Sequence, residues 1–78
     1  MAKLPRITGR ELVRALEKAG FQVSRQRGSH LQLRRVEPDN SVTTFPVPVH
    51  AGKTLKVGTL RGILRLAGLD IDDLINLL

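Results

Sequence analysis

The sequence predicts a small α+β domain in the order helix, three strands and helix, followed by one more short helix. Apolar residues recur at helical spacing near both ends of the chain. Between these segments, apolar and polar residues alternate over short stretches that are separated by turn-forming residues. With 78 residues and no internal repeat, the chain is expected to form a single domain over residues 1–78, in which residues 70–78 are a helical C-terminal extension.

The first helix is predicted over roughly residues 9–19. Thr8 and Glu11 have the spacing of a capping box, in which each side chain accepts a hydrogen bond from the backbone N–H of the other residue. Gly20 suits the position after the helix, because glycine adopts the left-handed conformation at little cost. The apolar stripe of this helix consists of Leu12, Val13, Leu16 and Ala19.

Two strands joined by a turn are predicted next. Phe21 and Val23 alternate with polar neighbours in the first strand, and residues 25–29 are expected to form the turn after it. In the second strand, Leu31 and Leu33 alternate with polar residues, so we expect these two leucines to face the helices.

A third strand is predicted over residues 41–49, after a turn at residues 37–40. Pro46 and Pro48 each lack the N–H that pairs neighbouring strands, so this strand is expected at an edge of the sheet. Residues 50–57 then form a loop.

Two helices complete the chain. Thr59 is expected to cap the first of them, Gly68 to end it, and Asp70 to cap the second. Their apolar stripes are Leu60, Ile63, Leu64 and Ala67 in the first helix, and Ile71, Leu74, Ile75 and Leu78 in the second.

The simplest arrangement of these elements has two layers, a three-stranded antiparallel sheet and both main helices on one of its faces. The other face of the sheet is then open to solvent. This is the architecture of double-stranded RNA-binding domains, although a shared fold does not by itself establish a function.

The charge of the chain favours a polyanionic partner. The formal net charge is +6, and all thirteen lysines and arginines lie within residues 1–69, with only four of the seven acidic residues. A body this basic most often binds nucleic acid. The two aromatic residues, Phe21 and Phe45, are too few to form a platform for stacking bases, so we expect contacts with phosphates, sugar hydroxyls and helix shape.

The sequence disfavours several other classes of site. It contains no cysteine, which excludes disulfides and thiolate metal sites. No apolar run approaches the roughly 20 residues of a membrane span, and residues 1–10 lack the apolar stretch of a signal peptide. We therefore expect a cytoplasmic protein without membrane contact. A metal or other cofactor is also not expected, because the two histidines lie twenty residues apart without an obvious carboxylate partner.

His30 is the candidate catalytic residue. Because neighbouring side chains of a strand point to opposite faces, His30, Gln32 and Arg34 are expected on the open face of the sheet. Three further arginines are expected near this surface or along its rim: Arg25, Arg27 and Arg35.

A histidine among arginines has a specific use on RNA. Imidazole exchanges protons near neutral pH, so it is suited to take the proton of a ribose 2′-OH. The 2′-oxygen then attacks the adjacent phosphate and leaves a 2′,3′-cyclic phosphate and a 5′-hydroxyl, while positive groups stabilise the charge on the phosphate. The residues alone favour a simpler alternative, in which His30 only contacts a phosphate or sugar. A Ser29–His30 nucleophile pair is disfavoured, since adjacent strand residues diverge.

Five short motifs follow one another along the chain: Gly28-Ser29-His30, Pro48-Val49-His50, LKVGTL at residues 55–60, Ile63-Leu64 and Ala67-Gly68-Leu69. In this order and spacing, the sequence resembles the HicA-type (YcfA-like) mRNA interferase toxins of bacteria and archaea. The resemblance extends from the first helix to Leu69. It implies a fold like that of double-stranded RNA-binding domains, cleavage of mRNA without a metal, and growth arrest. It also implies a HicB-type antitoxin that binds the toxin and blocks its site.

The resemblance assigns the catalytic role to His30, the histidine of the Gly-Ser-His motif. Gly28 and Ser29 then shape the entrance to the strand, and Gly58 and Thr59 match the start of the second helix. Many members have a second histidine directly after the first, where this chain has Leu31.

Two basic groups are predicted to bind RNA: Arg25, Arg27 and Arg34 in the first, and Lys53, Lys56 and Arg61 in the second. His50 is a candidate second acid or substrate contact. Two alternatives to a ribonuclease toxin remain open. The first is a non-catalytic double-stranded RNA-binding module that uses the same arginines, and the second is an interaction protein that acts through its acidic terminal helix.

Overall fold

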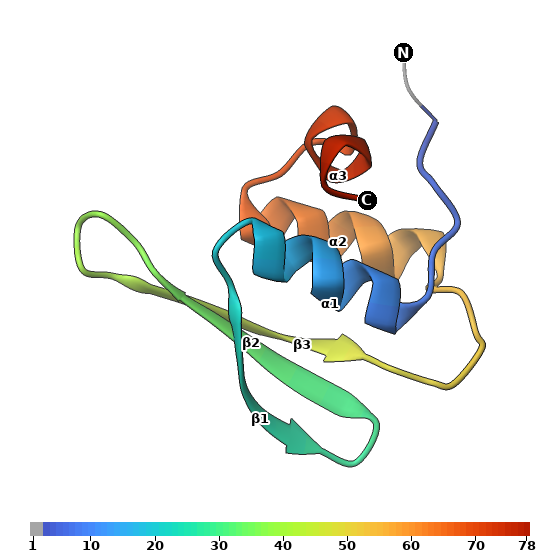
Figure 1. Ribbon diagram of the computed structural model, residues 1–78, viewed down its shortest axis with the longest axis horizontal. Coiled ribbons are helices and arrows are strands. Elements are labelled where there is room, and N and C mark those ends of the chain that lie inside the picture. Colours follow the sequence, from blue (N-terminus) through green and yellow to red (C-terminus); the bar gives the residue numbers. More distant parts are fainter. Residues whose placement is uncertain (1–2) are drawn as a thin grey trace.

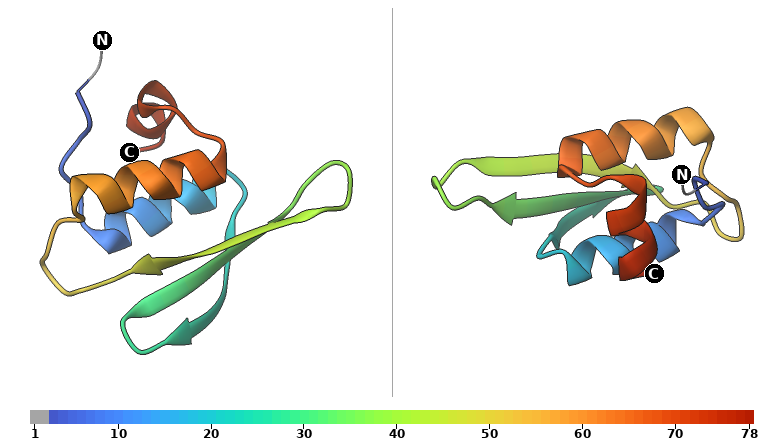
Figure 2. Two further views of the ribbon diagram at one scale, coloured as in Figure 1. Left: turned by 180° about the vertical axis from the view of Figure 1, so that it is seen from behind. Right: turned by 90° about the horizontal axis from the view of Figure 1, so that it is seen from above.

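The computed structural model describes residues 3–78, so the first two residues of the predicted domain lie outside it. Figure 1 shows α1 and α2 next to each other over one face of a three-stranded sheet, and the views in Figure 2 show the opposite face without a covering layer. The α+β fold predicted from the sequence is confirmed. Its elements are α1 (Gly9–Lys18), β1 (Gln22–Arg27), β2 (His30–Val36), β3 (Val42–Pro48), α2 (Val57–Ala67) and α3 (Ile71–Leu77).

Helix α1 begins and ends as the sequence predicts. The Thr8 hydroxyl accepts from the Glu11 N–H at 3.2 Å, and the Glu11 carboxylate accepts from the Thr8 N–H at 2.9 Å, which confirms the capping box. Ala19 is the C-cap residue of α1, and Gly20 follows it with a positive φ of 97°. Leu12 and Leu16 have no exposed surface and face the sheet layer.

The sheet has the order β1-β2-β3, with both pairings antiparallel. β1 continues to Arg27, so the turn predicted at residues 25–29 is shorter than expected and consists of Gly28 and Ser29 alone. Gly28 has φ +58°, whereas Ser29 has no positive φ. A two-residue hairpin favours this arrangement, with glycine in the first central position.

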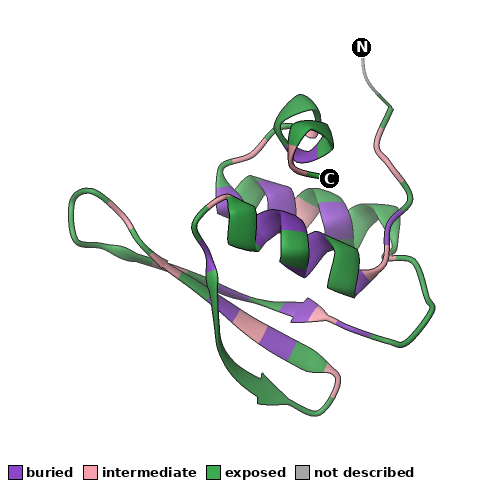
Figure 3. Ribbon diagram, viewed as in Figure 1, coloured by how far each residue is buried: buried purple, intermediate pink, exposed green. Residues whose placement is uncertain are grey.

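The core lies between the sheet and the helices (Figure 3). Leu31 and Leu33 of β2 are buried there, together with Phe45 and Val47 of β3. The alternation in β2 therefore places its leucines toward the helices as predicted. Val23 pairs with Leu33 but lies on the edge strand, and 41% of its surface remains exposed.

β3 is an edge strand, as its prolines predicted. Pro46 pairs with Gln32, and Pro48 pairs with His30. The next residue, Val49, donates its N–H to the carbonyl of Ser29 at 2.6 Å. Since N–H groups alternate in direction along a strand, the positions of both prolines are those whose N–H would point away from β2. The missing donors therefore cost the sheet no ladder hydrogen bond.

Helix α2 begins at Val57, three residues before the position predicted with Thr59 as its N-cap. The N-cap residue is Lys56, whose backbone is extended and whose side chain makes no capping hydrogen bond. The Leu60 N–H donates to the Lys56 carbonyl at 2.9 Å, so the helical ladder already includes Thr59 in its first turn. The prediction of Thr59 as N-cap is wrong. Gly68 ends the helix with φ +72°, as predicted.

Helix α3 is capped by Asp70 as predicted, through a capping box with Asp73. Leu74 is fully buried and packs in the core, but Ile75 is 42% exposed and Leu78 is 50% exposed. The predicted apolar stripe is therefore only partly correct. Because α3 is one short helix that contacts α1, only a narrow part of its surface reaches the core.

Arg35 joins the two helices to the sheet. Its guanidinium donates to the carbonyls of Ala19 at 3.1 Å and Ala67 at 3.4 Å, which are at the C-terminal ends of α1 and α2. It also lies 4.2 Å from the centre of the Phe21 ring and forms an ion pair with Glu37 at 3.0 Å. A cation is favoured at helix C-termini. Arg35 faces the helices, so its predicted place near the open face is wrong.

Candidate active site

His30 is displayed on the open face of the sheet. It is the first residue of β2 and is exposed, whereas its neighbour Leu31 is 8% exposed and lies in the core. The prediction that His30 is exposed and Leu31 is buried, made from the alternation of the strand, is confirmed. Leu31, the position next to His30 in the chain, belongs to the hydrophobic core.

Two arginines of β1 accompany His30. Arg27 pairs with His30 in the register of β1 and β2, and Arg25 pairs with Gln32. Because paired residues share a face of the sheet, the shorter turn brings both arginines onto the same face as His30. Together they line a hollow of about 520 Å³, whose walls are Arg25, Arg27, His30, Gln32 and Pro46.

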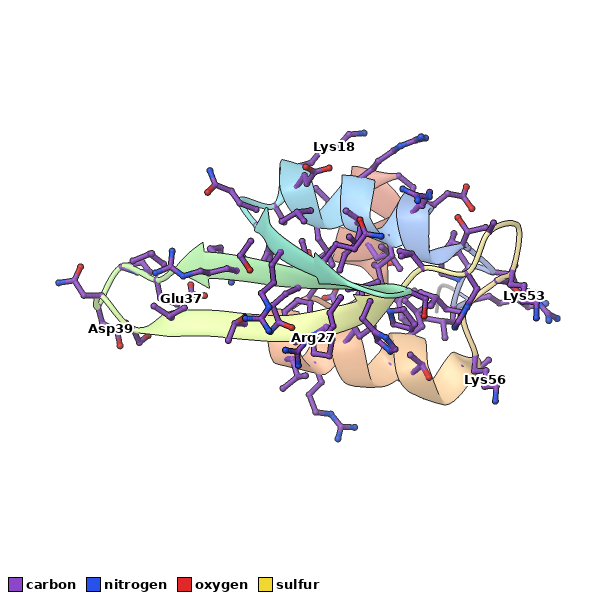
Figure 4. The ribbon with its side chains drawn as sticks, turned by 90° about the horizontal axis from the view of Figure 1, so that it is seen from below. Lys18, Arg27, Glu37, Asp39, Lys53 and Lys56 are labelled. Carbon is purple, nitrogen blue, oxygen red and sulfur yellow. The ribbon has the colours of Figure 1, made fainter. Side chains whose placement is uncertain are left out.

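The electrostatic character of this hollow is positive. The ion pair between Arg35 and Glu37 is the one found among residues 3–78, so Arg25 and Arg27 have no carboxylate partner within that range. Figure 4 views the molecule from the open side of the sheet and shows Arg27 lying over the strands. Two guanidinium groups beside one imidazole make a site suited to an anionic ligand.

Gln32 and Pro46 were not predicted to be part of the site. The Gln32 amide donates to the Thr44 hydroxyl at 2.8 Å, and that hydroxyl donates to the Leu33 carbonyl at 2.9 Å. These bonds hold Gln32 in place as one wall of the hollow. The sequence contained a signal for Pro46, since it alternates with Phe45 and Val47 and must face away from the core.

Arg34 lies on the same face but does not line this hollow. It pairs with Gln22 on β1 and with Thr44 on β3, one step of the alternation beyond Gln32. Its exposed side chain therefore extends the basic surface along β2.

A second hollow, of about 390 Å³, lies where β3 leads into α2. His50, Lys53, Lys56 and Thr59 contribute polar groups to it, and Pro48 forms the wall nearest to His30. Figure 4 shows Lys53 and Lys56 at the end of the sheet beyond Arg27. The structure thus brings His50 together with two of the three predicted residues of the second basic group.

Arg61 does not line that hollow. It lines a different hollow between α2 and α3, together with Arg65, Asp70 and Asp72. Lys56 is the N-cap residue with an extended backbone, whereas Arg61 lies within the second turn of α2, and the two line different hollows. The predicted role of Arg61 in binding RNA together with Lys53 and Lys56 stays a prediction.

The motif residues around the site have clear backbone roles. Gly28 supplies the positive φ of the hairpin turn, and the Ser29 carbonyl accepts from Val49, which ties the turn to the end of β3. Gly58 lies in the first turn of α2, where an added Cβ would meet nothing within 4 Å.

The described residues 3–78 form neither a metal-binding cluster nor a membrane-spanning helix. No group of three or more His, Cys, Asp or Glu side chains gathers there in a way that would hold a metal ion. Within the same residues, no helix has the length and apolar character needed to cross a membrane.

Comparison with known proteins agrees with the geometry. The family model described as "HicA toxin of bacterial toxin-antitoxin" matches residues 9–69, which include the whole sheet, both main helices and the two hollows. The chain belongs to the HicA toxin family. Membership implies a toxin that acts with an antitoxin partner. A search of curated proteins gave no match.

Proposed function

We propose that this HicA-family chain is an endoribonuclease that cleaves mRNA, with His30 as the general base. The observation that carries the proposal is an exposed imidazole beside two unpaired guanidinium groups on the open face of the sheet. The net charge of +6 favours a polyanionic substrate of this kind.

In the proposed reaction, His30 takes the proton of a ribose 2′-OH, and the 2′-oxygen attacks the neighbouring phosphorus. The bond from phosphorus to the 5′-oxygen breaks, which gives a 2′,3′-cyclic phosphate and a 5′-hydroxyl. General-base help of this kind is worth about 10²- to 10⁴-fold in rate. Neither step requires a metal or another cofactor.

The arginines have a separate role in this proposal. Arg25 and Arg27 hold the reacting phosphate beside His30 and stabilise the negative charge that builds up on its oxygens. Arg34 binds the RNA backbone further along β2, and Lys53 and Lys56 bind it beyond the end of the sheet. The aromatic residues take no part, because Phe21 and Phe45 pack against each other in the core at 5.2 Å between ring centres.

The antitoxin partner is proposed to be a HicB-like protein that covers the open face of the sheet. An acidic surface would match Arg25, Arg27 and Arg34, and its binding would bury His30. A bound partner would also stabilise this small fold by mass action.

The test of the catalytic role compares the wild type with His30→Ala and with Lys18→Ala, which removes one positive charge from α1. Growth after induction and cleavage of purified mRNA would be followed for all three proteins. We expect His30→Ala to lose toxicity and cleavage, and Lys18→Ala to keep both. If His30→Ala cleaves as well as the wild type, the catalytic assignment is wrong. Tight duplex binding by a wild type that leaves RNA intact would instead support a non-catalytic RNA-binding module.

A further inference from the structure

We propose that His50 is a second catalytic residue, which protonates the 5′-oxygen as it leaves. The proposal rests on the proposed function above, in which His30 removes the proton from the 2′-OH. That step alone leaves the 5′-oxygen to depart as an alkoxide, which is a poor leaving group. A positioned acid on the other side of the phosphate removes this obstacle.

The backbone register sets His50 diagonally across from His30. His30 pairs with Pro48, and the hydrogen bond from Val49 to the Ser29 carbonyl carries the pairing one residue beyond the strand ends. His50 is the next residue, and a continuation of the same register by one more step would set it across from Gly28. Diagonal residues of an antiparallel pair lie about 7–8 Å apart between Cα atoms. Two histidines whose Cα atoms are this close can both direct their rings at one phosphate, each within hydrogen-bond reach of about 2.6–3.2 Å.

His50 is exposed directly after the last core residue of this segment. Val49 is 8% exposed and contributes to the core, and His50 after it is exposed. The Lys53 N–H donates to the His50 carbonyl at 3.0 Å, so a turn holds the backbone of His50 at this position. On the helix side of β3, the start of α1 at Gly9 packs directly against the Pro48 carbonyl.

The turn at Gly28, next to His30, is open to solvent. Gly28 has no side chain, and a Cβ at that position would meet nothing within 4 Å. The hollow that contains His30 is lined by Pro46, and the hollow that contains His50 is lined by Pro48. These two prolines follow each other on the same face of β3, so an RNA backbone that passes from Arg27 to Lys53 crosses both histidines.

The protons and bonds balance in this scheme. Neutral His30 accepts the 2′-hydroxyl proton while the bond from the 2′-oxygen to phosphorus forms. Protonated His50 donates its proton to the 5′-oxygen while the bond from phosphorus to that oxygen breaks. The enzyme finishes with a protonated His30 and a neutral His50. Exchange of one proton with water at each ring restores the starting state.

The experiment uses an RNA oligonucleotide whose cleavage position by the wild type has first been mapped. A second version carries sulfur in place of the 5′-oxygen at that position. A thiol has a pKa near 8.5, far below that of an alcohol, so a thiolate leaves without help from an acid. Cleavage of both substrates would be measured for the wild type, His30→Ala, His50→Ala and His50→Gln. Lys53→Ala serves as a control in the same hollow.

We expect both His50 variants to cleave the oxygen substrate about 10²- to 10⁴-fold more slowly than the wild type and to approach wild-type rates on the sulfur substrate. His30→Ala should be slow on both substrates, and Lys53→Ala should be weakened on both by the same factor. Equal losses on both substrates for His50→Ala and His50→Gln would overturn the proposal and indicate a binding or structural role. Full activity of both variants on the oxygen substrate would also overturn it, and the role of His30 would then stand alone. Unimpaired cleavage by His30→Ala would overturn the proposed function itself.

Discussion

Arg34 and Arg35 are adjacent in the sequence, but their side chains lie on opposite faces of the sheet, so their substitution should have opposite consequences. Arg35 contacts the ends of α1 and α2 and the Phe21 ring, and its side chain is only 26% exposed. Arg34 is exposed beside the proposed RNA-binding face. We expect Arg35→Ala to destabilise the fold, and Arg34→Ala to weaken RNA binding while leaving stability nearly unchanged.

The contacts of Arg35 set the size of the expected effect. A hydrogen bond from a charged group contributes about 1.5–3 kcal/mol, and a cation over an aromatic ring about 0.5–2 kcal/mol. The bond to Ala67 is long at 3.4 Å, so we count the bond to Ala19 and the ring as the main contributions. The expected loss in the free energy of unfolding is then about 3 kcal/mol. For a domain of this size that corresponds to a fall in Tm of roughly 12–24 °C.

Thermal and urea unfolding of the wild type and three variants would test this. Arg35→Lys keeps the charge but loses the forked donor, so it should fall between the wild type and Arg35→Ala. Arg34→Ala should stay within about 0.5 kcal/mol of the wild type. The RNA affinity of Arg34→Ala should fall. The slope of its affinity against salt concentration, on logarithmic scales, should decrease by about 1, as expected for the loss of one phosphate contact. Equal losses of stability in Arg34→Ala and Arg35→Ala would refute the reasoning.

Three further predictions concern the folded state. Gly9→Ala should lower the free energy of unfolding by more than about 2 kcal/mol, because its Cβ would overlap the Pro48 carbonyl. The Cβ of Gly62→Ala in α2 meets nothing within 4 Å, so this variant should raise that free energy by up to about 1 kcal/mol. Urea unfolding would measure both. Gly28→Ala should cost about 1–2 kcal/mol despite the open space, because its φ is +58°, and cleavage should fall with it as the turn loosens. The free energy of unfolding should decrease in acid. Hydrogen bonds from neighbouring N–H and hydroxyl groups hold the pKa of three carboxyl groups below the ordinary value of 4.5 or 3.8. Their stabilisation is therefore complete above the ordinary values and is lost as the pH falls through the lower pKa values of the folded state. Urea midpoints between pH 7 and 3 would measure it, and a flat profile would contradict the role of these groups, which are Glu11, Glu37 and Asp39.

The sequence by itself determined the order of the elements and the exposure of His30. The capping box at Thr8 and Glu11 depends on residues three apart, and the alternation around Leu31 depends on the pleat of a single strand. Such interactions lie within a few residues, so local patterns contain all the information they need. The same alternation would have placed Arg35 toward the helices, had it been applied one step further along β2.

Only the tertiary structure decided which side chains accompany His30. The pairing of β1 with β2 reduced the turn to two residues and brought Arg25 and Arg27 onto the open face. The pairing of β3 with β2 set His50 across from the turn, and the packing of α3 on α1 left Ile75 exposed. Strand register and helix packing depend on contacts between residues far apart in the chain, and a local pattern contains no record of which partners will meet.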